Sequence, residues 1–247
     1  MTQPSRDLTL TGELVVGGGR ETDQVMTGNG LPPGQRRVEG FPRFGTHLSR
    51  PAPAVPLAPV IEVRGAVTAH VDLPLAVLSD LPRTEITADF HCVAGWSATG
   101  LRWEGVSFET FYRALIEPAL LPGATITHLL CRGLDGWKAA VTIEDVLAAD
   151  VLLAQNLNDR PLDSDHGAPV RLVSPSQYGY INIKHLCRID VLTAAPATTE
   201  GPLIRSHPRG RVWEEERHGF LPGRVVRPIY RSLIRPIRFL SSRGSRS

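Results

Sequence analysis

The sequence predicts an α+β protein with a mixed β-sheet and short helices. Segments with strand character are interspersed irregularly with short helix candidates, whereas a doubly wound fold would repeat strand and helix in turn. Hydrophobic residues make up 42% of the 247 residues, which is enough to build a buried core. We therefore expect one main domain with an extension at each end.

The expected strands are apolar or alternating segments, and the clearest turns between them are Ala94-Gly95 and Asp135-Gly136. A proline-rich stretch, residues 50–59, leads into the first strand. We expect strands at residues 60–67, 86–93, 124–131, 151–157, 170–173 and 181–192.

Short helices are expected between these strands. The first covers residues 73–81. The second covers residues 108–116 behind an N-cap at Ser107, because its bulky apolar residues share one helical face. The third opens at Thr142, which forms a capping-box pattern with Asp145, and runs through Ala149.

The two ends of the chain differ in composition from the middle. Residues 1–35 are rich in Gly and polar residues and should form an irregular arm, residues 36–195 the main domain, and residues 196–247 a basic tail. The tail has 11 arginines and 4 glutamates, so a chain with a net charge of only +2 has a mildly acidic body. Prolines 222, 228 and 236 should interrupt any long helix in the tail, which argues against a single amphipathic rod.

The tail allows two interpretations. In the first, its apolar residues wrap over the body while its arginines face solvent. In the second, it docks onto an acidic electron-transfer partner or onto an anionic membrane surface.

Cysteine usage indicates a reducing compartment. Cys92, Cys131 and Cys187 form no CxxC pair and no cluster with zinc-site spacing. The N-terminal residues lack a charged-then-apolar signal pattern, and no run of 18 apolar residues occurs. We expect a cytoplasmic location.

Three segments place reactive or polar residues where a strand gives way to a turn, a usual place for ligand-binding groups. They read FHCVAGWS at residues 90–97, HGAPVR at residues 166–171 and YGYINIK at residues 178–184. Each also has an ordinary explanation, because Cys92 can be a small buried hydrophobe and the charged residues can lie at the surface. Only their combination indicates a function.

In combination these segments resemble the oxidoreductase molybdopterin-binding domain of the sulfite oxidase family, which includes the molybdenum subunit of periplasmic methionine sulfoxide reductases. The resemblance covers roughly residues 35–191. Its most specific part is residues 150–191, with an apolar strand, His-Gly-x-Pro-x-Arg, a Tyr-Gly turn and a lysine before an Ile-rich strand. The Cys-x-x-x-Trp-Ser turn at residues 92–97, followed by Trp-Glu-Gly-Val at residues 103–106, matches the other half.

The resemblance implies a sulfite-oxidase-type fold and a molybdenum–molybdopterin cofactor. It makes Cys92 the catalytic residue and the metal ligand, since a soft thiolate suits a high-valent oxo-metal. His166, Arg171 and Lys184 fall where the family binds the pterin and its phosphate. The other cofactor-binding positions that the resemblance implies are Phe44, Gly45, Gly133, Asn182 and Ile183.

The activity implied is oxo transfer on a small sulfur-containing or related substrate, with electrons exchanged with a separate redox partner. Sulfite is disfavoured, because two arginines expected in sulfite oxidases are replaced here. Trp96-Ser97 follows the cysteine, and Ile181 precedes the lysine by three residues. The cysteine turn is closer to the sulfoxide-reductase branch, although that branch has asparagine at the position of His166.

Two other classes of function stay open at this point. One is a non-catalytic binding protein whose basic tail grips an anionic partner; its arginines lack interleaved aromatic residues, so we expect no nucleic acid. The other is a metal-free thiol enzyme with Cys92 as nucleophile and His91 as base. Adjacent residues of a strand point to opposite faces, which disfavours that pair.

Overall fold

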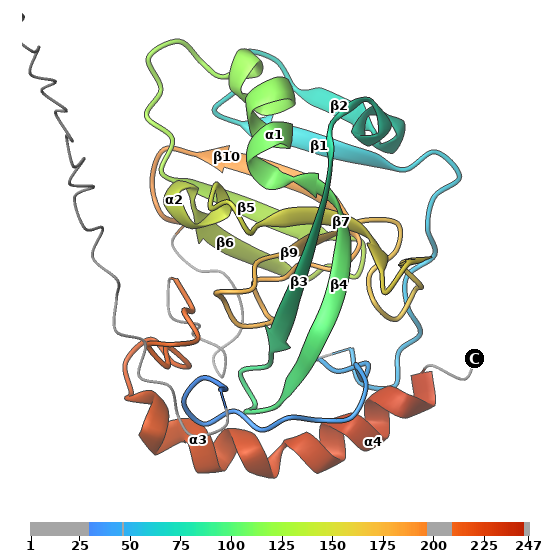
Figure 1. The fold of residues 1–247 in the computed structure, drawn as a ribbon. Helices are drawn as coiled ribbons and strands as arrows, with labels where there is room; N and C mark the ends of the chain where they lie inside the picture. Colours follow the sequence, from blue (N-terminus) through green and yellow to red (C-terminus); the bar gives the residue numbers. More distant parts are fainter. Residues whose placement is uncertain (1–29, 46, 197–208, 245–247) are drawn as a thin grey trace, which may run out of the picture.

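Two β-sheets form the body of the protein, and a pair of C-terminal helices lies along one side of it (Figure 1). The computed structural model describes residues 30–45, 47–196 and 209–244. Most of the predicted N-terminal arm, and residues 197–208 of the predicted tail, lie outside the described residues. The predicted α+β class with mixed strands and short helices is confirmed.

The first sheet contains both parallel and antiparallel neighbours. Its strands, in spatial order, are β2 (Val71–Pro74), β1 (Val60–Gly65), β10 (Leu186–Leu192), β5 (His128–Gly133) and β6 (Lys138–Thr142). β1 and β10 run parallel, and the other neighbours are antiparallel. Burial alternates along β1, where Ile61 and Val63 are buried and Glu62 and Arg64 are less so, which places one face of the sheet against the core.

The second sheet is antiparallel and carries the cysteine hairpin. Its strands, in spatial order, are β3 (Arg83–His91), β4 (Ser97–Ser107), β7 (Leu152–Leu157) and β8 (Arg160–Pro161), and β9 (Arg171–Val173) also pairs with β7. β3 and β4 form a hairpin whose connection contains Cys92. Val106 and Leu153 of this sheet pack in one core cluster with Ile61 and Ile189 of the first sheet. The two sheets therefore share a hydrophobic core.

Short helical segments connect the strands. They are η1 (Leu75–Asp80), α1 (Phe108–Phe111), η2 (Tyr112–Ile116), η3 (Glu117–Ala119) and α2 (Ile143–Val146). Ser107 caps α1 as predicted, because its side chain accepts a hydrogen bond from the Thr110 N–H at 3.1 Å. The Thr142 side chain likewise accepts from the Asp145 N–H at 3.2 Å, but α2 ends at Val146 and does not reach Ala149.

The strand predicted over residues 181–192 is wrong in its first part. β10 starts only at Leu186, and the preceding residues form turns, in which the Ile181 N–H donates to the Tyr178 carbonyl at 2.9 Å. Ile181 and Ile183 are buried in the core, so their apolar character reflects packing and not strand pairing. The sequence prediction also omitted β2, β4, β6 and β8.

The strand β4 contains Gly105 at its contact with β7. A Cβ atom on Gly105 would lie 2.0 Å from the carbonyl oxygen of Leu153 on β7. The register between β4 and β7 shifts between Glu104 and Gly105, and the two backbones approach closely there. Gly105 is therefore required by the contact between two strands and does not mark a turn.

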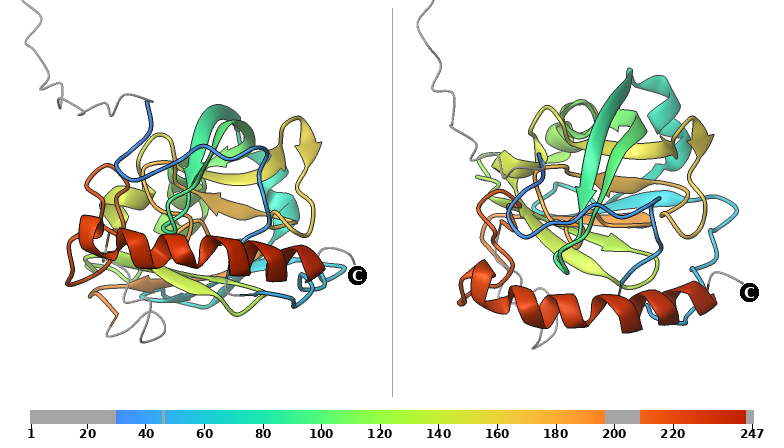
Figure 2. Two further views of the ribbon diagram at one scale, coloured as in Figure 1. Left: turned by 90° about the horizontal axis from the view of Figure 1, so that it is seen from below. Right: turned by 60° about the horizontal axis from the view of Figure 1, so that its bottom comes forward.

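The C-terminal helices are α3 (Gly223–Ser232) and α4 (Ile234–Gly244), with Leu233 between them (Figures 1 and 2). The prediction that prolines interrupt a long helix is wrong for Pro228, which lies inside α3. Pro228 and Arg224, one turn earlier, are exposed, so water can solvate the carbonyl oxygen that loses its helical partner. Pro236 lies in the first turn of α4, where a missing N–H costs little. No helix among the described residues is long and apolar enough to cross a membrane.

The orientation of these helices agrees only in part with the first interpretation of the tail, since Ile234 packs against the body but several other apolar residues face outward. Val226 is buried, but Leu221, Val225, Ile229, Leu233 and Phe239 are exposed. Arg227 points inward and binds Glu215 through two hydrogen bonds of 2.8 and 2.7 Å. Arg231 donates to the Gly34 carbonyl at 3.4 Å. Acceptors on the body therefore fix which face of the helices turns inward, and part of the apolar face is left outside.

We predict that Gly105→Ala lowers the free energy of unfolding by about 1–3 kcal/mol, because the new methyl group has no room beside the Leu153 carbonyl. Denaturant unfolding of the two proteins measures this difference. Thr87→Ala, on the exposed side of β3, is the control and should change stability by less than about 0.5 kcal/mol. Equal stability of Gly105→Ala and the native chain would contradict the close approach.

Candidate active site

Cys92 lies in the turn that joins β3 to β4. Its N–H donates to the Trp96 carbonyl at 2.8 Å, and its carbonyl accepts from the Gly95 N–H at 2.9 Å. Gly95 has a φ of 102°, a backbone conformation that favours glycine. The turn holds Cys92 in an apolar cluster with Ala94, Trp96 and Trp103. The predicted turn at Ala94-Gly95 is confirmed.

The surroundings of Cys92 do not suit a free nucleophile. Burial raises the pKa of its thiol to about 12, against smaller opposing effects from a hydrogen bond with the Ala94 backbone and from the charge of Arg217. The free thiol is therefore neutral and weakly nucleophilic near pH 7. A metal ion bound to the sulfur would displace the proton directly.

His91 does not have the contacts of a base for Cys92. Its Nδ1 atom lies 2.8 Å from the Ser97 hydroxyl. Burial lowers the pKa of His91 to about 4, so the ring is neutral near pH 7. This geometry argues against the metal-free thiol enzyme.

Arg171, at the start of β9, has a fully buried side chain. Its guanidinium donates to the carbonyl oxygens of His166 at 2.8 Å and Asn182 at 3.2 Å. The group lies over the ring of Trp103 at 5.1 Å, and over two phenylalanine rings, Phe41 and Phe90, at 5.8 and 5.6 Å. Burial lowers its pKa to about 9. The positive charge is thus held by neutral carbonyls and aromatic faces.

Lys184 adds a second positive group to this region. Its Nζ atom donates to the Asp165 carbonyl at 2.5 Å. Burial is the main cause that lowers its pKa to about 7, and the charges of Arg171 and Arg43 lower it further. An anion bound among these groups would favour the charged form of the lysine.

Two further basic residues, Arg43 and His47, belong to the same region and were missed by the sequence analysis. Arg43 forms an ion pair with Asp165, with Nε and Oδ1 3.1 Å apart. The pKa of His47 is lowered to about 4 by burial and then by the charges of Lys184 and Arg43. Both lie within three residues of Phe44, one of the cofactor positions that the resemblance implied, and that proximity was the signal that could have identified them.

These residues fit a cofactor that carries an anionic group. Within the described part of the chain, the Nε atom of Arg171 and the Nε2 atom of His47 are buried and lack a hydrogen-bond partner. Buried donors of this kind are rare unless another group completes them. A phosphate would supply both acceptors and negative charge, and Arg171 and Lys184 would hold it.

Aromatic side chains connect this basic region to the cysteine turn. Phe41 packs against Phe90 with ring centroids 4.9 Å apart and against Trp96 at 6.5 Å. Phe44, one of the predicted cofactor residues, packs edge-on against Trp96 at 5.5 Å. Cys92 and Arg171 therefore border one apolar cluster and are not scattered over the surface.

His166 is held by contacts on both sides of its ring. Its Nδ1 atom lies 2.7 Å from the Asp163 carboxylate, and its Nε2 atom lies 2.8 Å from the Phe41 carbonyl. The imidazole also stacks on the Phe41 ring at 4.9 Å. These contacts orient the Phe41 loop against the Arg171 region; a direct contact of His166 with the pterin stays a prediction.

Asn182 and Ile183 position the backbone beside Lys184. The Asn182 side chain accepts from the Ser174 N–H at 2.8 Å and donates to the carbonyl of the same serine at 3.2 Å. The Ile183 side chain is buried, and its carbonyl accepts from the Leu172 N–H at 2.9 Å. The two residues therefore fix the carbonyl of Asn182 that Arg171 contacts.

Two predicted glycines stand at close approaches. A Cβ atom on Gly133 would lie 2.3 Å from the Lys184 carbonyl oxygen, so β5 can end against the lysine only at a glycine. Gly45 has a φ of 153°, and a Cβ atom there would lie 3.0 Å from the His47 ring. Both glycines thus border residues of the basic region.

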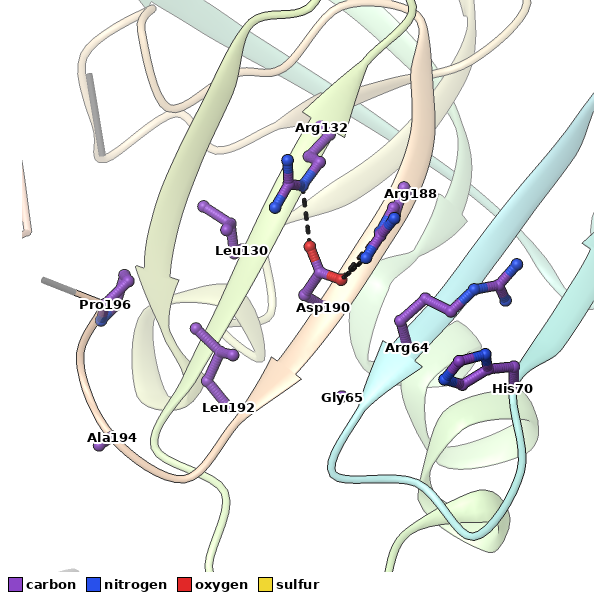
Figure 3. A pocket seen from close by; sticks show the side chains of 10 residues that line it. All are labelled: Arg64, Gly65, His70, Leu130, Arg132, Arg188, Asp190, Leu192, Ala194 and Pro196. Atoms are coloured by element: carbon purple, nitrogen blue, oxygen red, sulfur yellow. Dashed lines mark hydrogen bonds and ion pairs between the residues drawn. The ribbon is translucent and has the colours of Figure 1, made fainter. Parts of the chain in front are cut away.

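A cavity of about 420 Å³ opens beside the basic region and is partly covered by α4. It is lined by Phe41, Arg43, Asp165 and His166 from the body, and by Arg238 and Ser242 from α4. Another cavity, of about 450 Å³, lies elsewhere, on the first sheet (Figure 3). Its Arg132 and Arg188 share the carboxylate of Asp190, each through an Nε contact of 2.8 Å, so part of their charge is already offset.

The C-terminal segment supplies a positive charge next to the cysteine turn. The fully buried side chain of Arg217 donates to the Val93 carbonyl, to the Pro33 carbonyl at 3.1 Å and to Glu215 at 3.1 Å. Its guanidinium lies over the Tyr178 ring at 5.2 Å. No sequence signal marked Arg217, because it comes from outside the region of resemblance and meets Cys92 only in the folded chain.

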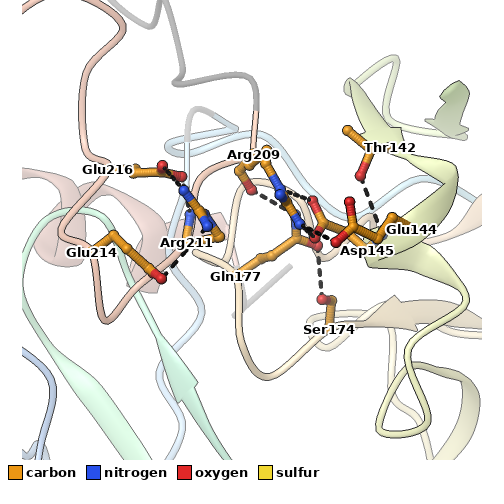
Figure 4. A network of polar contacts seen from close by, with 9 residues as sticks. All are labelled: Thr142, Glu144, Asp145, Ser174, Gln177, Arg209, Arg211, Glu214 and Glu216. Atoms are coloured by element: carbon orange, nitrogen blue, oxygen red, sulfur yellow. Dashed lines mark hydrogen bonds and ion pairs between the residues drawn. The ribbon is translucent and has the colours of Figure 1, made fainter. Parts of the chain in front are cut away.

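A polar network attaches the start of the C-terminal segment to the body (Figure 4). Arg209 forms an ion pair with Asp145 of α2, and its carbonyl accepts from the Gln177 amide at 2.5 Å. Gln177 in turn accepts from the Ser174 hydroxyl at 2.8 Å. The segment that carries Arg217 is thereby fixed beside the turn that contains Tyr178.

Protein side chains alone do not form a metal cage here. Among the residues that the structure describes, no group of three or more His, Cys, Asp or Glu side chains is placed to hold a metal ion. A metal bound to Cys92 would therefore take its other ligands from a cofactor, as a dithiolene-bearing pterin can provide.

Comparisons with known proteins agree with this chemistry. Residues 52–199, more than half of the chain, match the family described as "Oxidoreductase molybdopterin binding domain". The uncharacterized oxidoreductase YuiH of Bacillus subtilis is 31% identical over 160 residues, which cover 64% of this chain and 76% of the relative.

Two further similarities involve longer proteins. The catalytic subunit MsrP of a protein-methionine-sulfoxide reductase from Gluconobacter oxydans is 28% identical over 182 residues, which cover 64% of this chain and 56% of MsrP. The crystal structure of the sulfane dehydrogenase SoxCD from Paracoccus pantotrophus matches with a TM-score of 0.51 and 22% identity, over 63% of this chain and 44% of that chain. The chain thus spans about half the length of these two proteins, and the second match concerns the fold alone.

We predict that Cys92 reacts slowly with iodoacetamide in the metal-free protein. A pKa near 12, against 9.0 for an ordinary thiol, leaves about 10³-fold less thiolate at pH 8. Because the pKa is raised, the rate should rise about tenfold per pH unit between pH 7 and 10. Mass spectrometry of the alkylated peptide measures the rate at Cys92 separately from Cys187, which is less buried. A titration midpoint at or below 9 would contradict the buried, neutral thiol.

We predict that Arg217→Gln destabilises the metal-free protein by about 3 kcal/mol. The substitution removes a buried ion pair with Glu215 and the hydrogen bonds to the carbonyls of Val93 and Pro33. Alkylation of Cys92 should become faster, because release of the Val93 carbonyl exposes the thiol and removes part of the burial that raises its pKa, an effect larger than the loss of the Arg217 charge. Arg224→Gln, at an exposed position of α3, is the matched control and should leave both properties unchanged. Slow alkylation in a destabilised Arg217→Gln protein would show that Arg217 stabilises the fold without positioning the cysteine turn.

Proposed function

This chain belongs to the oxidoreductase molybdopterin-binding domain family, and from that premise we propose that it carries out oxo transfer on a small sulfur-containing substrate and exchanges electrons with a separate redox partner. The molybdenum cofactor of the family is the cofactor of this chain. The observation that carries the proposal is the apolar cluster with a buried cysteine on one side and, on the other, the buried Arg171 guanidinium, whose Nε atom lacks a hydrogen-bond partner.

Different residues of the chain would bind the metal and the pterin of the cofactor. Cys92 would ligate the metal through its sulfur, while Arg171 and Lys184 would hold the phosphate of the pterin, with His47 beside them. Phe41, Phe44 and the other rings of the cluster exclude water from the space between these points. When bound, the molybdenum centre supplies an acceptor or donor of an oxygen atom and two electrons.

The substrate class rests on the cysteine turn and on the relatives. The name of MsrP describes a reaction at sulfur. Apolar residues surround Cys92, and Arg217, whose charge acts on it, is already engaged by two carbonyls and Glu215. These features support a sulfoxide or another uncharged sulfur compound over sulfite, which is a dianion.

The location and the redox partner are part of the same proposal. The three free cysteines, with Cys92 and Cys131 buried, are compatible with the reducing cytoplasm that the sequence predicts. A separate electron-transfer protein would reach the site most directly from the side of the 420 Å³ cavity beside α4.

The test is metal and pterin content after production in a host that makes the molybdenum cofactor. We expect about one molybdenum and one pterin per chain, measured by elemental analysis and by fluorescence of the oxidised pterin. Lys184→Met should lower pterin retention by about 10–100-fold, because it removes a charge-assisted contact with the phosphate. Lys138→Met, on β6, is the matched control and should retain both groups.

Cys92→Ser separates the two halves of the proposal. It should retain pterin, which is held by the basic region, while molybdenum binding weakens because a hydroxyl is a poorer ligand than a thiolate for this metal. Native protein without pterin, or Lys184→Met protein with full pterin content, would overturn the assignment. A non-catalytic binding protein is favoured if neither group is present in any of the four proteins.

A further inference from the structure

The outward side of the C-terminal helices combines apolar and basic residues. We call it the outer face and define it by Val225, Ile229, Leu233 and Phe239 together with Arg224, Arg235 and Arg243. Val225 is 57% exposed, Ile229 65% and Phe239 59%. The spacing of four residues from Val225 to Ile229 and Leu233 aligns these side chains along α3.

The helices cannot rotate about their axes to bury this face against the body. Their inward side is fixed by the buried Val226, by the two hydrogen bonds between Arg227 and Glu215, and by the contact of Arg231 with the Gly34 carbonyl. Farther along, Arg43 donates to the Ser241 carbonyl of α4 at 3.5 Å. Turning the apolar residues inward would break these contacts and leave Glu215 without Arg227.

The charged residues of the outer face are all positive. No Asp or Glu follows Glu216 in the sequence, whereas arginines occur at intervals to the end of the chain. Arg224, Arg235 and Arg243 are exposed, and the Arg243 guanidinium lies 4.6 Å from the centre of the Phe239 ring. The partner of this face must therefore accept apolar side chains and also offer negative charge.

We propose that the outer face binds the surface of an anionic phospholipid bilayer. Interfacial helices of this type insert apolar side chains into the boundary between headgroups and acyl chains, while flanking arginines contact the phosphates. α3 and α4 lie nearly end to end along one side of the molecule, with the body entirely on the other side (Figure 2). They thus present a long outward side that a lipid surface can accommodate and a protein groove would have to enclose.

Other partners fit this face less well. A second copy in a twofold interface would place arginines against arginines with no acidic residue of the helices to offset them. Nucleic acid offers phosphates but no apolar surface for Val225, Ile229 and Leu233, and base stacking would have only Phe239 to use. The bilayer is the one of these partners that satisfies both the apolar and the basic residues. This proposal does not depend on the cofactor.

The test is binding of the full chain to vesicles in a sedimentation assay. Phosphatidylcholine vesicles that contain phosphatidylglycerol should bind the protein, and pure phosphatidylcholine vesicles should bind it much more weakly. The double variant Val225→Ser/Ile229→Ser should bind the anionic vesicles at least about tenfold more weakly. Arg235→Gln/Arg243→Gln should weaken binding by about 5-fold per arginine on anionic vesicles only.

Two controls keep the result interpretable. Leu57→Ser removes a fully exposed leucine remote in sequence from the helices and should leave vesicle binding unchanged. Circular dichroism and thermal unfolding establish that each variant is folded, which is expected because the substituted side chains are exposed.

Three outcomes would overturn the proposal. The first is the absence of binding to anionic vesicles. The second is equal binding by the native chain and Val225→Ser/Ile229→Ser. The third is a stable dimer in size-exclusion chromatography that this double variant converts to monomer while vesicle binding stays the same, which would assign the face to a second copy.

Discussion

The structure around the candidate site depends on one buried guanidinium group, that of Arg171. Burying a charge without an opposite charge beside it is costly, and the side chain of Arg171 is fully buried. Backbone carbonyls of His166 and Asn182 and the faces of aromatic rings offset that cost in part. The loop before β9, the turns before β10 and the Phe41 loop must therefore all approach the same point. An anionic ligand is what such an arrangement lacks.

The C-terminal segment completes the site from the opposite side. Glu215 holds Arg217 and Arg227 together, so a single carboxylate connects the cysteine turn with helix α3. Arg217 then reaches both Val93 and Pro33, which brings residues from the beginning, middle and end of the chain into contact. The cysteine hairpin is thus held at its tip and not only through the strands β3 and β4.

The sequence predicted the parts of this protein that depend on local chemistry. The Ser107 cap, the Ala94-Gly95 turn and the α+β class follow from residue preferences within a few positions. The grouping of Arg171 and Lys184 came from the family resemblance, and the structure places both in one basic region. Contacts between distant segments were not predictable: His47 became part of the region through tertiary packing, and Arg217 reached Cys92 from more than 100 residues away.

The errors of the sequence prediction also come from contacts between distant segments. The strand β4 was not predicted, and its Gly105 is required where β4 meets β7. Ile181 and Ile183 looked like strand residues because they are apolar, although they pack in the core from a turn. In one of the two interpretations of the tail its apolar residues cover the body, and Val226 and Ile234 do so, but the pairing of Arg227 with Glu215 leaves Val225 and Ile229 outside. A helical sequence pattern records which residues share a face and does not record which face turns inward.

The position of Arg217 has a practical consequence for dividing this protein into parts. The matched family region ends at residue 199, and a fragment cut there would contain the whole of that region. Such a fragment would lose Arg217 and leave Val93, one residue after the cysteine, with an unfilled carbonyl beside an uncovered apolar cluster. Inactivity of that fragment would report damage to the cysteine turn and not a regulatory role of the excised helices. Point substitutions on the solvent side of α3 and α4 therefore separate the function of these helices from the structural role of the tail at the cysteine turn.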